Sequence, residues 1–153
     1  MIEIGHPAPD FILPQDGGAD IALSSLQGGP VVLYFYPRDD TSGCTLEALD
    51  FTARADDFAA AGARVLGVSK DSVASHGKFR AKHGLGIALL SDAEGDVCER
   101  YGVWVEKNMY GKKSMGIERA TFLIDANGKL AKIWRKVKVT GHAADVLKAI
   151  NAL

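Results

Sequence analysis

Residues 31–45 have the sequence VVLYFYPRDDTSGCT. Its first part, Val31 to Tyr36, is an unbroken apolar run of β-branched and aromatic residues, which is typical of a central strand covered on both faces. Pro37 ends the run, because proline cannot donate to a strand ladder. A polar loop follows, and Cys44 then lies in the first turn of a helix. The segment predicts a buried strand that leads directly to a helix with a thiol at its N-terminus.

The helix that begins near Cys44 is expected to continue to a glycine stop at Gly62. Apolar residues recur along it at helical spacing, at Phe51, Ala55, Phe58 and Ala59. Because Phe51 follows Cys44 by two helical turns, we expect the thiol to lie on the apolar face of this helix.

The rest of the chain alternates strands and helices. Residues 1–30 are typical of an extended hairpin or loop, and residues 107–113 of a solvated loop. Further strands are expected at residues 65–68, 87–90, 120–124 and 130–134, the last two as a hairpin, and further helices at 72–83, 92–101 and 143–150. This order predicts an α/β sandwich with a mixed central sheet flanked by helices, in one domain over residues 1–153.

Composition narrows the class of partner. The chain has 153 residues, 18 basic and 19 acidic, so its formal net charge is −1. Without a basic excess, we expect no nucleic-acid partner and no anionic membrane surface, and a small molecule or a protein is favoured. No apolar run is long enough for a spanning helix, and no secretory signal is apparent. Two cysteines in such a chain indicate a reducing compartment, the cytoplasm.

A thiol at a helix N-terminus has a chemical consequence. Unpaired backbone N–H groups and the positive end of the helix dipole favour a thiolate over a thiol. Ionisation alone gains only a modest rate, because a more stable thiolate is a weaker nucleophile. A fast thiol enzyme therefore also needs donors that stabilise charge on the departing group. Thr41, the amides of Gly43 and Cys44, and an arginine brought in by the fold are candidates.

The pattern Pro-x-x-x-Thr-x-x-Cys at residues 37–44 resembles the peroxidatic motif of peroxiredoxins. The longer string YFYPRDDTSGCTLEALDF, residues 34–51, is similar to the bacterioferritin-comigratory or Q-type subfamily. Further similar segments are GVSKDS at 67–72, LLSDAEG at 89–95, YGVW at 101–104 and ERATFLID at 118–125. The resemblance implies a thioredoxin-like three-layer sandwich, thiol-dependent reduction of hydroperoxides, and an antioxidant role that needs no metal or organic cofactor.

The resemblance also implies roles for individual residues. Cys44 corresponds to the peroxidatic cysteine, and its thiolate would attack a hydroperoxide to give water or an alcohol and a sulfenic acid. Thr41 corresponds to the hydroxyl that bonds the sulfur and the peroxide, Pro37 to the residue that shields the pocket, and Arg119 to the arginine that completes the site. Glu47 could pair with an arginine and fix its orientation, or lie on a solvated helix face.

Two residues depart from the subfamily pattern. Leu49 stands where many members carry a second cysteine, and Ser42 stands where a proline is usual. The remaining thiol, Cys98, has two readings: it resolves the Cys44 sulfenic acid as a disulfide, or it is a buried apolar residue and an external thiol resolves Cys44. An intermolecular disulfide is a third option. The implied reductant is thioredoxin or a glutaredoxin-like protein with glutathione, and the implied state is a monomer.

Two other functions compete with the peroxidase. A thiol–disulfide or electron-transfer protein is disfavoured, because the chain lacks a Cys-x-x-Cys pair. A non-catalytic interaction or holdase module would be oxidised at Cys44 without turnover. His76 and His83 could share a helix face, but a metal site there is disfavoured without a third ligand.

Overall fold

The predicted buried strand lies inside a seven-stranded mixed sheet. In the computed structural model, which describes residues 2–153, β3 (Val31–Phe35) pairs in parallel with β4 (Arg64–Ser69) and antiparallel with β8 (Ala120–Ile124). The other strands of the sheet are β1 (Ile12–Gln15), β2 (Gly18–Ala22), β5 (Ala88–Ser91) and β9 (Leu130–Trp134), and the strand order is β2-β1-β5-β4-β3-β8-β9. All residues of β3 and β8 are buried, as a doubly covered strand requires.

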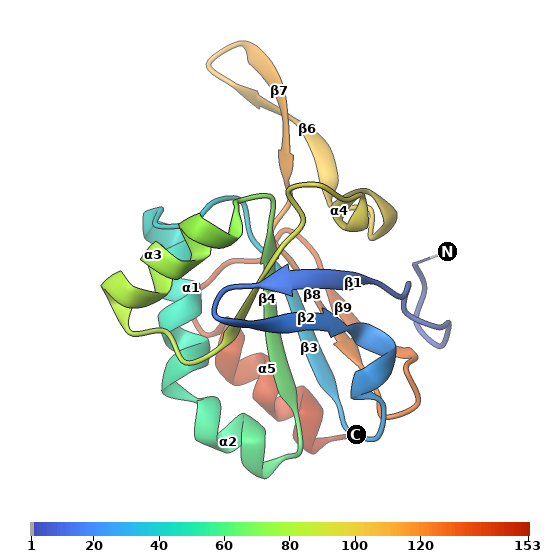
Figure 1. Cartoon of the computed structure of the whole chain (residues 1–153). Helices are drawn as coiled ribbons and strands as arrows, with labels where there is room; N and C mark the ends of the chain where they lie inside the picture. Colours follow the sequence, from blue (N-terminus) through green and yellow to red (C-terminus); the bar gives the residue numbers. More distant parts are fainter. Residues whose placement is uncertain (1) are drawn as a thin grey trace.

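Helices cover the two faces of this sheet unequally (Figure 1). One face is covered by α1 (Ser42–Ala53), α2 (Ala55–Ala60), α3 (Val73–His83) and α5 (His142–Asn151). The other is covered by α4 (Val97–Arg100), the 3-10 helix η1 (Leu23–Leu26) and the segments beside them. The expected thioredoxin-like sandwich is confirmed. Within residues 2–153, no helix combines the length and the apolar character needed to cross a membrane.

The side chains of β3 divide the core into two halves. Val31, Leu33 and Phe35 pack in one apolar cluster, whereas Val32 and Tyr34 pack in the other, because successive side chains of a strand point to opposite faces. The half under α1, α2, α3 and α5 contains the first turn of α1. The chain that leaves β3 therefore begins α1 on the helix-rich face of the sheet.

Two predicted helices differ from the structure. The helix expected to reach Gly62 is two helices, with a break at Arg54 (φ −106°, ψ 14°), and the break leaves the rings of Phe51 and Phe58 in contact at 5.8 Å between centroids. The helix expected over residues 92–101 is only α4. Asp92 explains the late start, because its carboxylate accepts the N–H groups of Val97 and Cys98 and holds the preceding residues in a turn.

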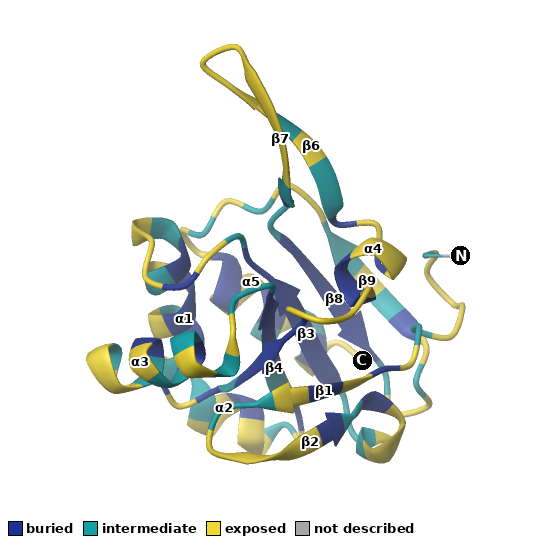
Figure 2. Cartoon of the chain, turned by 45° about the horizontal axis from the view of Figure 1, so that its top comes forward, coloured by how far each residue is buried: buried dark blue, intermediate teal, exposed yellow. Residues whose placement is uncertain are grey.

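The prediction of a solvated loop at residues 107–113 is wrong. These residues belong to an antiparallel hairpin of β6 (Trp104–Met109) and β7 (Lys112–Ile117), which pairs with no strand of the main sheet. Its two-residue turn has positive φ at Tyr110 (53°) and Gly111 (79°), the conformation favoured in tight hairpins. The hairpin projects away from the body of the molecule (Figures 1 and 2).

Candidate active site

Cys44 is in the first turn of α1, on the buried side of the helix. Its side chain is 1% exposed and belongs to the same apolar cluster as Ala48 and Phe51, as the helical spacing predicted. The thiol is free. The fold thus surrounds the sulfur with apolar groups on the side of the core, where few solvent molecules compete for its contacts.

Arg119 supplies the charge beside the sulfur. It lies between β7 and β8, and its Nη2 donates to the Sγ of Cys44 at 3.4 Å. The Nη1 of the same guanidinium donates to Oε1 of Glu47 at 2.7 Å. Arg119 and Cys44 are far apart in the sequence. The pairing of β8 with β3 places Arg119 near the start of α1.

Glu47 is buried one turn after Cys44, with 1% of its surface exposed. Burial raises the pKa of this carboxyl to about 7, although the Arg119 charge opposes the rise. Its Oε2 has no hydrogen-bond partner among the described residues. Of the two readings of Glu47, the pair with an arginine is therefore the one that the structure contains.

Gly43 leaves space for the guanidinium of Arg119. The sequence analysis did not predict this role of Gly43. A Cβ on Gly43 would lie 3.2 Å from Nη2 of Arg119, closer than most such contacts in proteins. The absence of a side chain therefore allows the guanidinium to lie over the first turn of α1. The glycine itself was the available signal, since a helix start does not otherwise favour it over alanine.

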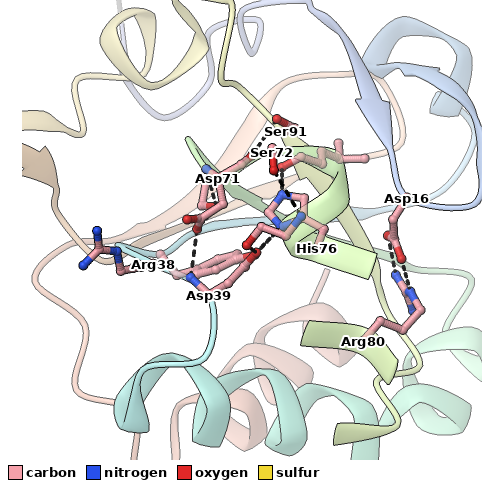
Figure 3. Close-up of polar contacts among 12 residues, drawn as sticks. Asp16, Arg38, Asp39, Asp71, Ser72, His76, Arg80 and Ser91 are labelled. Atoms are coloured by element: carbon pink, nitrogen blue, oxygen red, sulfur yellow. Dashed lines mark hydrogen bonds and ion pairs between the residues drawn. The ribbon is translucent and has the colours of Figure 1, made fainter. Parts of the chain in front are cut away.

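The loop before α1 is fixed to α3 by a buried polar cluster (Figure 3). The carboxylate of Asp39 accepts hydrogen bonds from Tyr36 Oη at 2.6 Å, Ser75 Oγ at 2.7 Å and His76 Nδ1 at 2.7 Å. The backbone N–H of Asp39 donates to Asp71 Oδ2 at 2.8 Å. This loop, on which α1 starts, is thus held from several directions.

His76 lies between two hydrogen-bond acceptors in this cluster. Its Nδ1 faces the carboxylate of Asp39 and its Nε2 faces the carbonyl oxygen of Leu90 at 2.9 Å, so both nitrogens must donate. Burial disfavours the charged ring, but hydrogen bonding and the charge of Asp39 hold the pKa of His76 above its ordinary value. His83, the other histidine of α3, bonds Asp40 at 2.8 Å.

The other two predicted site residues are in the same loop but contact different groups. Pro37 is half-buried directly after Tyr36. Thr41 is the N-terminal cap residue of α1 by position, yet its side chain makes no capping bond. Its hydroxyl donates to the carbonyl oxygen of Arg38 at 3.0 Å, and within residues 2–153 it makes no hydrogen bond to Cys44.

Known proteins are similar to this chain in sequence and in fold. The profile of the AhpC/TSA family matches residues 4–133. The chain belongs to the AhpC/TSA family.

Peroxiredoxin Bcp of Bacillus subtilis is 50% identical over 150 residues, which cover 98% of this chain and 96% of that protein. The bacterioferritin comigratory protein of Xanthomonas campestris superposes with a TM-score of 0.91 at 46% identity, covering 98% of both chains. Xylella fastidiosa PrxQ superposes with a TM-score of 0.93 at 40% identity, covering 99% and 97%. The chain is thus a peroxiredoxin of the Bcp or Q type and a thiol-dependent peroxidase.

The second thiol of this peroxiredoxin is far from the first in the fold. Cys98 is in α4, is 0% exposed, and packs in the apolar cluster that contains Leu33 and Phe35. Cys44 packs in the cluster on the opposite face of the sheet. Burial raises the pKa of the Cys98 thiol far above its ordinary value, and the nearby carboxylate of Asp92 raises it further.

Proposed function

We propose that Cys44 is the thiol that reduces the hydroperoxide. The observation that carries this assignment is the guanidinium of Arg119, which contacts both the Cys44 sulfur and the buried Glu47. The thiolate attacks the terminal oxygen of ROOH, a sulfur–oxygen bond forms and the oxygen–oxygen bond breaks. The departing oxygen takes a proton and leaves as water or an alcohol, and Cys44 becomes a sulfenic acid.

The donors around the sulfur stabilise the departing oxygen. Arg119 is in place, and the first backbone N–H groups of a helix, which have no partner within the helix, are available as further donors. Rotation of the Thr41 side chain away from Arg38 would bring its hydroxyl toward the incoming peroxide, and Pro37 would shield that pocket. We propose hydrogen peroxide and organic hydroperoxides as substrates. An alkyl peroxide reduction activity is attributed to the similar Xanthomonas campestris protein.

Recycling of Cys44 is assigned to an external thiol. A disulfide needs Cα atoms within about 7 Å, and the central sheet lies between the two cysteines. The Cys98 thiol is also buried and resists ionisation, which makes it a poor nucleophile. An incoming thiol would condense with the Cys44 sulfenic acid to a mixed disulfide and water, and a second thiol would release Cys44 in its reduced form. Thioredoxin or glutaredoxin with glutathione would supply these thiols.

The test is peroxide consumption driven by dithiothreitol. Cys44→Ser should reduce turnover to the uncatalysed rate, whereas the matched variant Cys98→Ser should stay within about twofold of the unmodified protein. Turnover that survives in Cys44→Ser would refute the assignment. After one equivalent of peroxide, the intact mass should rise by one oxygen atom; a loss of two hydrogens would return Cys98 to the role of resolving cysteine.

Three further properties belong to this proposal. We assign a monomer, a single domain over residues 1–153, and a place in the reducing cytoplasm. The support is the pair of free cysteines, which suits a reducing compartment, and the single sheet that both apolar clusters share. A sedimentation measurement of the reduced and the oxidised protein tests the monomer.

A further inference from the structure

The β6–β7 hairpin, residues 104–117, carries an unusual surface, which we call the hairpin arm. Large apolar side chains are exposed on it: Tyr110 is 100% exposed, Met109 64% and Met115 50%. Figure 2 shows the exposed tip standing clear of the body. Exposed apolar side chains contribute no burial energy to the stability of the fold, and patches of them mark interaction sites.

The hairpin arm is also cationic. It contains three lysines, Lys107, Lys112 and Lys113, against one acid, Glu106, whereas the whole chain carries a formal charge of −1. Glu106 lies 3.8 Å from Lys113, and both side chains are largely exposed, so this pair neutralises little of the field. An approaching partner therefore meets tyrosine and methionine side chains framed by positive charge.

The base of the hairpin arm adjoins the active site. β7 ends two residues before Arg119. Burial and the nearby Arg119 guanidinium lower the pKa of Lys107, and the Cys44 sulfur acts on the same ammonium in the opposite sense. In the same first part of α1 as Cys44, Leu46 is 46% exposed. The base of the arm thus lies close to the residues around Cys44, while its exposed tip is free for a partner.

We propose that the hairpin arm is the docking surface for the protein that reduces oxidised Cys44, a small dithiol protein with an apolar, acid-rimmed surface around its reactive thiol. The proposal rests on the function proposed above. With six residues in each strand, the arm extends roughly 20 Å at about 3.4 Å per residue. A small thiol such as glutathione needs only the mouth of the site, whereas a protein surface can contact the whole length.

The dithiol partner supplies both electrons that the reduction of the Cys44 sulfenic acid requires. Its first thiolate attacks the Cys44 sulfenic acid, forms a sulfur–sulfur bond and releases water. Its second thiol then attacks the partner's own sulfur in that bond, so Cys44 leaves as a thiolate and the partner leaves as a disulfide. Charge complementarity on the arm acts on encounter, before either step, and raises the association rate.

The experiment compares three reductants: thioredoxin with its NADPH-dependent reductase, glutaredoxin with glutathione, and dithiothreitol. We expect Lys112→Glu/Lys113→Glu to lower kcat/KM for the preferred protein reductant on the order of tenfold at low salt, with the gap closing as ionic strength rises. Tyr110→Ser should lower the same constant by severalfold at every salt concentration. Dithiothreitol-driven turnover and the rate of peroxide consumption in a single turnover should stay within about twofold.

The matched control is Lys132→Glu/Lys148→Glu, the same change of charge at exposed lysines of β9 and α5. An equal loss in this control, or an unchanged kcat/KM in the arm variants, would overturn the proposal. So would a shift in sedimentation of the arm variants, which would make the arm a contact between copies of this chain, or a preference of the unmodified protein for dithiothreitol. A loss of dithiothreitol-driven turnover in the arm variants would also contradict the docking role, whereas an absence of that turnover in the unmodified protein would instead contradict the function proposed for Cys44.

Discussion

At the residue scale, the guanidinium of Arg119 links a reactive sulfur to a buried carboxyl group. Burying Arg119 and Glu47 costs solvation of both charges, and their contact at 2.7 Å offsets that cost only if both remain in place. The same geometry leaves Nη2 free to donate to Cys44 at 3.4 Å. We therefore propose that Glu47 is a positioning residue, which acts on the sulfur through Arg119.

Gly43→Ala separates activity from stability. A methyl group at this position would lie 3.2 Å from Nη2, so the guanidinium must shift by a few tenths of an ångström. We expect the second-order rate constant for peroxide to fall by about tenfold, since donors act over narrow distances. The helix should gain up to about 1 kcal/mol, because alanine is the better helix former. Stopped-flow peroxide kinetics and urea unfolding measure the two effects, and a fully active variant would contradict the role assigned to Gly43.

Glu47→Gln should change how stability depends on pH. Burial disfavours the charge of Glu47 and raises its pKa from the ordinary value of 4.5 to about 7 in the folded protein. Its contribution to stability is therefore fully present below about pH 4.5 and is lost as pH rises through about 7. Relative to Glu47→Gln, the unmodified protein should lose about 3 kcal/mol between about pH 4 and about pH 9. Denaturant titrations of both proteins at each pH measure the free energy of unfolding. If it varied with pH in the same way in both proteins, the carboxyl of Glu47 would be excluded as the cause of the pH dependence.

At the scale of elements, α3 sets the position of the loop from which α1 begins. Asp39 in that loop is joined to Ser75 and His76 of α3, and His76 also bonds the carbonyl of Leu90 in β5. The first turn of α1, which carries Cys44, thus depends on an ion pair buried between three elements. Loosening this pair should affect the reaction without any direct contact to the sulfur.

His76→Gln tests the ion pair through its pH dependence. The pKa of His76 is raised in the folded protein, mainly because Asp39 outweighs the effect of burial. The stabilisation is therefore complete below about pH 6.5 and is lost as pH rises through the folded-state pKa. We expect His76→Gln to cost about 3 kcal/mol at about pH 6 and clearly less at about pH 10, measured by chemical unfolding. His83→Gln on the same helix is the control, and an equal, pH-independent loss in both variants would refute the charged pair.

The sequence predicted those elements whose signals are local. The apolar run of β3 and the helix expected at residues 72–83, which is α3, are confirmed. The break at Arg54 was missed because the apolar spacing continues through it, and the late start of α4 was missed because a hydrogen bond to the side chain of Asp92 decides it. The hairpin arm was missed because only its base, at Trp104 and Ile117, packs on the core, and its other residues are mostly polar and exposed and so lack an alternating pattern.

The same division holds for the candidate site. Cys44 and Arg119 were found through motifs that lie in separate segments, and the sheet register then places them together. The pairing of Asp39 with His76 spans 37 residues and gives no periodic signal in the sequence. The role of Gly43 depends on a distance to Arg119, which only coordinates contain.

At the scale of the whole molecule, the central sheet separates the two thiols. Strand β3 contributes to both apolar clusters, with Cys44 in one and Cys98 in the other. Cys44 is in the first turn of a helix, where fraying exposes a side chain at little cost in free energy. The backbone N–H of Cys98 donates to the carboxylate of Asp92, and the side chain of Cys98 is covered by the rest of its cluster. The two thiols should therefore become accessible through different opening events.

Alkylation rates of the single-cysteine variants measure these events. With Cys98 alone, in Cys44→Ser, labelling should require an opening free energy close to that of global unfolding and should share its dependence on urea. With Cys44 alone, in Cys98→Ser, labelling should need at least about 2 kcal/mol less and respond weakly to urea, because only one helical turn opens. If Cys98 were instead labelled as fast as Cys44 and with the same shallow urea dependence, α4 would open locally. An internal disulfide would then be within reach, and the need for an external thiol at the hairpin arm would disappear.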